Sequence, residues 1–167
     1  MKLFIIEDNR LFAHLLAKVL KLEDYEVSVA YDGKSALEFI EKNEIHLILL
    51  DLILPDMEGT EILTAVRKNY NQSEIPVIAL SASTTEQKIV DVLSLGANDF
   101  VAKPYNIEIL KLKVKNLLDL QQTYKELKEA NVLIKEAGEQ YLAQAEELRQ
   151  LIECVKPSGL DLPMSDE

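Results

Sequence analysis

The sequence has little of what disulfide-rich, membrane-spanning and nucleotide-binding proteins require. Its single cysteine, Cys154, rules out any disulfide within the chain. Its five glycines are scattered, so no glycine-rich phosphate loop is present. No apolar run approaches membrane-spanning length, and the N-terminus turns acidic after a handful of apolar residues, too few for a signal-peptide core. We therefore expect a cytoplasmic protein with no membrane partner.

Basic residues are scarce as well. The chain has 18 lysines and arginines against 29 aspartates and glutamates, a formal net charge of -11 and a pI near 4.7. Most of such a surface repels nucleic acid, so no direct nucleic-acid partner is expected. The 167 residues are 48% hydrophobic, which is enough for one domain of ordinary size with a proper core, plus an appendage.

The stretch from Leu47 to Gly59 organises the rest of the chain. An uninterrupted apolar run ends on Asp51 and is then broken by Pro55 and Gly59. This pattern predicts a fully buried strand that delivers Asp51 to the edge of a sheet. Taken alone, the acid has a less favoured interpretation as a helix N-cap or a turn residue.

Strand-like and helix-like segments alternate over the first part of the chain. The five predicted strands cover residues 3–6, 25–30, 45–50, 76–80 and 99–102. Apolar residues recur at helical spacing after each strand; those of the first helix are Leu11, Leu15, Leu16, Val19 and Leu20. Gly96 is expected to end the fourth helix. Five such units at short spacing predict an α/β fold, a doubly wound five-stranded parallel sheet with helices on both faces.

Ligands bind such sheets beyond the carboxyl ends of the strands, and four strand ends carry chemically useful side chains. These are Glu7 and Asp8, Asp51, Ser81, and Lys103. Three neighbouring carboxylates repel one another unless a cation lies among them, and hard oxygen ligands suit Mg²⁺ or Mn²⁺. One carboxylate could then act as a phosphoryl-accepting nucleophile, while a lysine and a hydroxyl stabilise the phosphoryl oxygens.

These motifs resemble the receiver domain of bacterial two-component response regulators, over about residues 1 to 120. The resemblance rests on the acid pair Glu7-Asp8, the block of residues 51–59, Ser81-Ala82 and Lys103-Pro104, in this order and at this spacing. It implies a flavodoxin-like sheet with strand order 2-1-3-4-5. Two-component signalling would then be the function.

The resemblance also implies a role for each site residue. Asp51 would be the phosphoacceptor. The metal would be held by Glu7, Asp8, Asp51 and the backbone carbonyl of Ile53. The phosphoryl group would be bound by Ser81, the backbone of Ala82, and Lys103. Ser81 and Phe100 would form the switch, and a cis peptide is expected between Lys103 and Pro104.

Two residues of the acceptor loop need separate interpretation. Ile53 occupies a position that is often polar in relatives, and an apolar side chain there is expected to slow the attack of water on the phosphoryl group. Asp56 is interpreted as a turn residue rather than a fourth metal ligand.

A seven-residue apolar repeat follows the receiver-like part and is typical of a coiled-coil helix. Its main positions are Leu120, Leu127, Ile134, Tyr141, Leu148 and Val155. The companion positions are Leu117, Tyr124, Asn131, Gly138, Ala145 and Ile152. A rival seam includes Ala130, Ala137 and Leu151, so register, orientation and strand number stay open.

The predicted domains are therefore a receiver domain over residues 1–120, a coiled-coil helix over 121–155 that continues the fifth helix, and a flexible tail or linker over 156–167. A helix of that length extends about 60 Å, too far to bury its whole apolar stripe on its own small domain. We expect a homodimer through residues 117–155. The alternative is a helix that folds back on its own domain.

The sequence thus predicts a response regulator that accepts a phosphoryl group on Asp51 from a histidine kinase or phosphotransfer protein. It would signal through the dimerising helix, as a switch rather than an enzyme. Alternatives are a coiled-coil interaction scaffold, the N-terminal part of a larger response regulator, or a Mg²⁺-dependent phosphohydrolase. Against the last, Ile53 stands where a second acid would follow the nucleophile. The sequence identifies neither the kinase nor the output.

Overall fold

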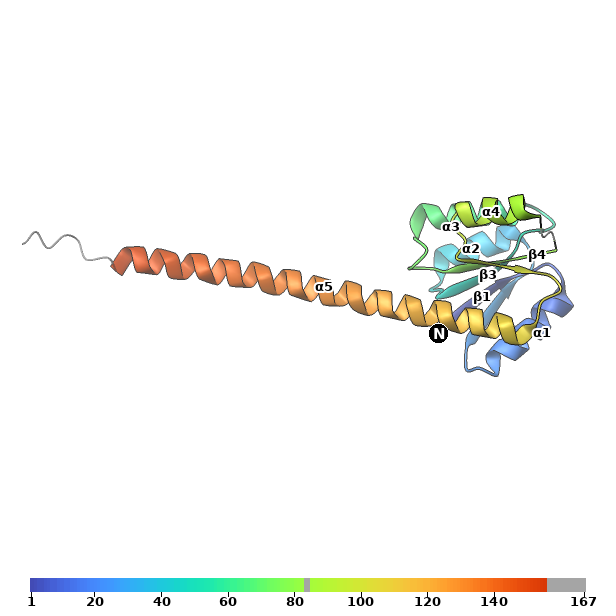
Figure 1. Ribbon diagram of the computed structural model, residues 1–167, viewed down its shortest axis with the longest axis horizontal. Coiled ribbons are helices and arrows are strands. Elements are labelled where there is room, and N and C mark those ends of the chain that lie inside the picture. The colour runs from blue at the N-terminus through green and yellow to red at the C-terminus, as the bar shows by residue number, and fades with distance from the viewer. Residues whose placement is uncertain (83–84, 156–167) are drawn as a thin grey trace, which may run out of the picture. The chain divides into compact units, whose positions relative to one another are not determined.

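The computed structural model of the chain describes residues 1–82 and 85–155 (Figure 1). The predicted tail over 156–167 lies outside the described residues. The chain divides into two compact units, Met1–Lys125 and Glu126–Glu167. Within the described ranges, no helix combines the length and the apolar character needed to cross a bilayer.

The first unit contains a parallel sheet of five strands. They are β1 (Lys2–Ile6), β2 (Glu26–Ala30), β3 (Leu47–Asp51), β4 (Val77–Ser81) and β5 (Asp99–Ala102). Their order is β2-β1-β3-β4-β5, so the predicted doubly wound, flavodoxin-like fold is confirmed. Every residue of β3 and β4 is buried, which accounts for their continuous apolar runs.

Helices cover both faces of the sheet. They are α1 (Arg10–Lys21), α2 (Gly33–Lys42), α3 (Gly59–Asn69), α4 (Glu86–Ser94) and α5 (Ile107–Val155). The apolar core between α1, the first part of α5 and the sheet is separate from the core under α2, α3 and α4 (Figure 1). Gly96 follows α4 with a φ of 103°, a conformation that favours glycine and ends the helix as predicted.

The apolar pattern of α1 only partly predicts its buried face. Leu16 and Leu20 are buried, but Leu11 and Leu15 are 68% and 50% exposed. The core contacts of the helix come instead from its small residues Ala13 and Ala17 together with the two buried leucines. The buried stripe therefore follows positions 13, 16, 17 and 20, and the two exposed leucines lie on the opposite side of the helix.

Arg67 of α3 joins several segments at the edge of the sheet where the strands begin. Its guanidinium donates to the carbonyl oxygens of Gly96 (2.7 Å), Ile75 (2.9 Å), Tyr70 (3.3 Å) and Asn71 (3.4 Å), and to Oδ1 of Asn98 (3.1 Å). All of these partners are neutral, and burial lowers the pKa of Arg67 to about 10. The cation therefore acts as a multiple hydrogen-bond donor between α3, the start of β4 and the α4–β5 turn.

We expect Arg67→Met to lower the free energy of unfolding by about 2–4 kcal/mol, because several carbonyl groups lose their donor at once. Urea denaturation measures the change. Lys68→Met, at the exposed neighbouring position, is the matched control and should shift stability by less than about 0.5 kcal/mol. Equal losses in the two variants would contradict this role.

Candidate functional site

Three carboxylates meet at the carboxyl edge of the sheet. Glu7 and Asp8 follow β1, and Asp51 ends β3. One oxygen from each of the three carboxylates lies within 4.8 Å of the others. Glu7 and Asp51 are only 2% and 6% exposed, whereas Asp8 is exposed. Three hard oxygen donors with one open side fit a Mg²⁺ ion that keeps several waters.

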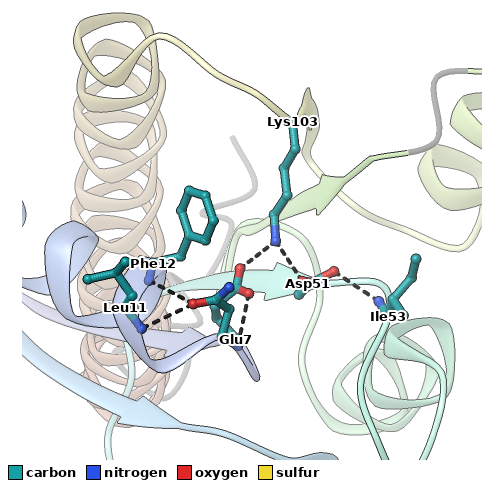
Figure 2. Close-up of polar contacts among 7 residues, drawn as sticks. Glu7, Leu11, Phe12, Asp51, Ile53 and Lys103 are labelled. Atoms are coloured by element: carbon teal, nitrogen blue, oxygen red, sulfur yellow. Dashed lines mark hydrogen bonds and ion pairs between the residues drawn. The ribbon is translucent and has the colours of Figure 1, made fainter.

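Lys103 reaches the same place from the end of β5. Its Nζ lies 2.5 Å from Oε2 of Glu7 and 2.6 Å from Oδ2 of Asp51 (Figure 2). Its backbone N–H donates to the carbonyl oxygen of Ser81 over 2.8 Å. The Lys103–Pro104 peptide bond is cis. One ammonium group is therefore shared between two of the acids.

The environment of this cluster raises the pKa values of Glu7 and Lys103. Burial, assisted by the charge of Asp51, raises the pKa of Glu7 against the opposing effect of the Lys103 ammonium. Burial acts to lower the pKa of Lys103, but the hydrogen bonds and charges of Asp51 and Glu7 outweigh it and raise that pKa. The ammonium form of Lys103 is thus favoured by the two acids that it contacts.

Backbone groups hold the acids in place. The N–H of Ile53 donates to Oδ1 of Asp51 over 2.9 Å, and the N–H of Asn9 donates to Oε1 of Glu7 over 3.2 Å (Figure 2). Gly59 packs against Asp51 itself, since a Cβ there would lie 2.3 Å from the Asp51 carbonyl oxygen. The loop can return this closely only because residue 59 has no side chain.

Asp56 is engaged away from the acid cluster. Its two carboxylate oxygens accept the backbone N–H groups of Gly33 (2.8 Å) and Lys34 (2.9 Å) at the start of α2. These bonds lower the pKa of Asp56. The side chain thus anchors the loop after Asp51 to a helix N-terminus, which agrees with its interpretation as a loop residue and not a ligand.

A depression of about 250 Å³ opens onto the cluster. It is lined by Glu7, Asp8, Asn9, Phe12, Asp51, Ile53, Ala82 and Lys103. Sequence reasoning did not include Asn9 or Phe12. Asn9 caps α1 by accepting the N–H groups of Leu11 and Phe12, which aims the first turn of α1 at the depression. The available signal was an Asn directly before the helical repeat.

Ser81 and Phe100, the expected switch residues, lie on neighbouring strands. Ser81 ends β4 and is fully buried. Phe100 on β5 is half-buried and packs against the apolar core under α2, α3 and α4. The backbone of Ala82, also expected at the site, belongs to the lining of the depression. Ser81 therefore lies at the same edge of the sheet as Asp51, although it is not among the residues that line the depression, and the ring of Phe100 packs on the adjoining helical layer.

Comparison with known proteins identifies the family. Residues 3–115 match the model of the response regulator receiver domain. The chain belongs to this family. Its C-terminal continuation, residues 116–167, lies beyond the matched region.

Solved receiver structures resemble the chain at moderate identity. The receiver domain of the Francisella response regulator 1452 is 30% identical, with a TM-score of 0.67 over 71% of this chain and 96% of its own. A CheY-like receiver domain protein from Methanospirillum hungatei is 31% identical, with a TM-score of 0.69 over 74% and 97%. TrrA from Thermotoga maritima, solved in complex with Mg²⁺ and beryllium fluoride, is 29% identical, with a TM-score of 0.62 over 70% and 97%.

We expect Lys103→Met to lower the free energy of unfolding in metal-free buffer by about 1–3 kcal/mol, because Glu7 and Asp51 lose their shared counter-charge. Added Mg²⁺ should then raise the Tm of this variant more than that of the wild type. Thermal denaturation in EDTA and in Mg²⁺ measures both effects.

The matched control for this prediction is Lys113→Met, which removes a lysine whose Nζ lies 2.5 Å from Asp99 on β5. Its response to Mg²⁺ should equal that of the wild type. A smaller Mg²⁺ response in Lys103→Met than in the wild type would show that the ammonium does not neutralise the acids.

Proposed function

We propose that this chain is a phosphorylation-controlled switch in which Asp51 accepts a phosphoryl group in a Mg²⁺-dependent reaction. The observation that supports this most directly is the meeting of three acids and Lys103 at one opening. The chain has all three acids, the lysine and a hydroxyl at Ser81. This complete set favours a chain that accepts a phosphoryl group over an interaction scaffold that cannot be phosphorylated.

The proposed reaction moves a phosphoryl group from a phosphohistidine to the Asp51 carboxylate. A carboxylate oxygen attacks phosphorus, the P–N bond breaks as the P–O bond forms, and the released imidazole takes a proton from water. The Ile53 N–H holds Oδ1 and Lys103 faces Oδ2, which fixes the plane of the nucleophile. Lys103 then stabilises the charge on the transferred oxygens.

Magnesium would be held by Glu7, Asp8, Asp51 and the carbonyl of Ile53, and would neutralise charge that the acids and the phosphoryl group bring together. The donor set supports this assignment, because hard carboxylate oxygens within 4.8 Å of one another match the preference of the ion. The Thermotoga maritima relative in complex with Mg²⁺ and beryllium fluoride also supports it.

The phosphoryl donor would be a histidine kinase or a phosphotransfer protein. Phe12 and Ile53 line the depression beside the acids, and Leu11 and Leu15 of α1 are also exposed. Exposed apolar side chains beside a charged centre suit a protein donor, since their burial would exclude water from the transfer.

The response would be a shift of Ser81 toward the phosphoryl group, followed by rearrangement of Phe100 and α4. The burial of Ser81 beside the site and the packing of Phe100 on the α4 side support this route. Phosphorylation would change the population of two arrangements and so act on a homodimer formed through α5. In this proposal the chain is a cytoplasmic signalling switch and not an enzyme with a separate substrate.

We expect the wild-type chain to gain one phosphoryl group from acetyl phosphate in Mg²⁺, and Asp51→Asn to gain none, because the amide cannot act as the nucleophile. Intact-mass spectrometry measures the gain. Asp56→Asn is the matched control: it changes an acid of the same loop that is occupied by α2, and it should still be phosphorylated. A wild-type chain that never gains mass would favour the interaction scaffold.

A second expectation concerns the lifetime of the phosphoryl group. Ile53 is 58% exposed at the mouth of the site, where an apolar side chain cannot orient an attacking water. Ile53→Asn should shorten the half-life of the aspartyl phosphate several-fold, whereas Ile53→Leu should leave it unchanged. Loss of the phosphoryl mass after removal of the donor gives both rates, and equal half-lives for all three proteins would reject the role of Ile53.

A further inference from the structure

We infer that residues 127–152 of α5 pair with the same segment of a second copy of this chain, parallel and in register. This inference rests on the proposed homodimer and adds its orientation, its seam and its contacting layers. It concerns only the second compact unit, in which α5 continues from Glu126 to its end at Val155.

Among the described residues of the chain, nothing covers a row of large apolar side chains on α5. Leu127, Ile134, Tyr141 and Leu148 are 60%, 69%, 73% and 59% exposed. They are seven residues apart, so they form one continuous ridge along a slightly supercoiled helix. A row of this length in water is typical of a surface that another helix covers.

Small residues next to the ridge indicate where the second helix approaches most closely. Asn131, Gly138 and Ala145 lie along one side of it at the same seven-residue spacing. A Cβ added to Gly138 would have no atom within 4 Å, so no contact in the part of the chain that the structure describes requires glycine there. Glycine is also less favourable than alanine inside a helix. The close approach of a second helix would explain why a glycine stands at this position.

Parallel pairing in register also fills the space that Gly138 leaves. Each seam residue then faces its own copy, so the layer of Tyr141 lies between the layers of Gly138 and Ala145. Two large rings between two small layers follow the alternation of sizes that dense packing needs. Asn131 also meets Asn131 of the second copy, an arrangement that fixes the register of parallel pairs at some cost in stability.

Charges beside the seam select the parallel orientation. Lys128, Lys135 and Arg149 share one flank of the ridge. In an antiparallel pair this flank faces itself, which brings Lys128 of each copy opposite Arg149 of the other. In a parallel pair the basic side chains face Thr123, Ala130 and Gln144 of the second copy. Because juxtaposed like charges disfavour association, the parallel pair is preferred.

The first part of the test establishes whether a dimer exists. Light scattering on the full chain in EDTA, in Mg²⁺, and in Mg²⁺ with beryllofluoride should give a dimer in at least the last condition. A monomer in all three would overturn both the homodimer and this inference. A monomer would not contradict the proposed phosphorylation of Asp51, because intact-mass spectrometry tests that proposal separately.

The second part maps the seam with single thiols in a Cys154→Ser background. Oxidation with diamide should crosslink Asn131→Cys and Ala145→Cys about tenfold faster than Glu136→Cys, the control on the far side of the helix. A disulfide needs two Cα atoms within about 7 Å, and only seam positions that face their own copy come that close.

Two results would overturn the inference while the dimer stands. Faster crosslinking of Ala130→Cys than of Asn131→Cys would place the rival seam at the centre. A dimer in which neither Asn131→Cys nor Ala145→Cys crosslinks to itself, while a thiol pair at positions 131 and 148 does, would show an antiparallel pair. Light scattering of each reduced variant confirms that it remains a dimer before oxidation.

Discussion

The double ion pair of Lys103 is the interaction on which the site depends. Glu7 and Asp51 come from different strands, are nearly fully buried, and would repel each other if both were charged without a partner. The ammonium of Lys103 reduces the repulsion between the two acids. The cis Lys103–Pro104 peptide follows this lysine directly in the chain. The strand order then matters, because β1, β3, β4 and β5 are the neighbours that can contribute to one edge.

Much of this arrangement could be predicted from the sequence, because it follows from local patterns and one topological rule. Continuous apolar runs indicated parallel strands buried on both faces, and parallel strands present their last residues at one edge. The acids after β1, Asp51 and Lys103 could be grouped on that basis before any contact was known. Their chemical roles stay predictions, since proximity alone does not establish phosphoryl transfer.

What could not be predicted are contacts between segments that no local pattern connects. Nothing in the sequence around Asp56 indicates that it accepts the N–H groups of Gly33 and Lys34, far away in the chain. The apolar period of α1 also placed Leu11 and Leu15 with the core residues, although alanines supply much of that helix's buried face. Periodicity reports where apolar residues recur, while the sheet determines which of them fit beneath it.

Different interactions hold the segments together at the two ends of the sheet: ion pairs at one end and hydrogen bonds to neutral groups at the other. At the carboxyl end, Lys103 contacts two acids, whereas at the opposite end Arg67 donates to neutral carbonyl and amide oxygens. Dissolved ions weaken attraction between charges, though less for buried pairs than for exposed ones, and they act little on hydrogen bonds to neutral acceptors. The edge that carries the chemistry is therefore the more sensitive of the two to the ionic composition of its surroundings. The edge that holds α3 and the α4–β5 turn together depends on it less.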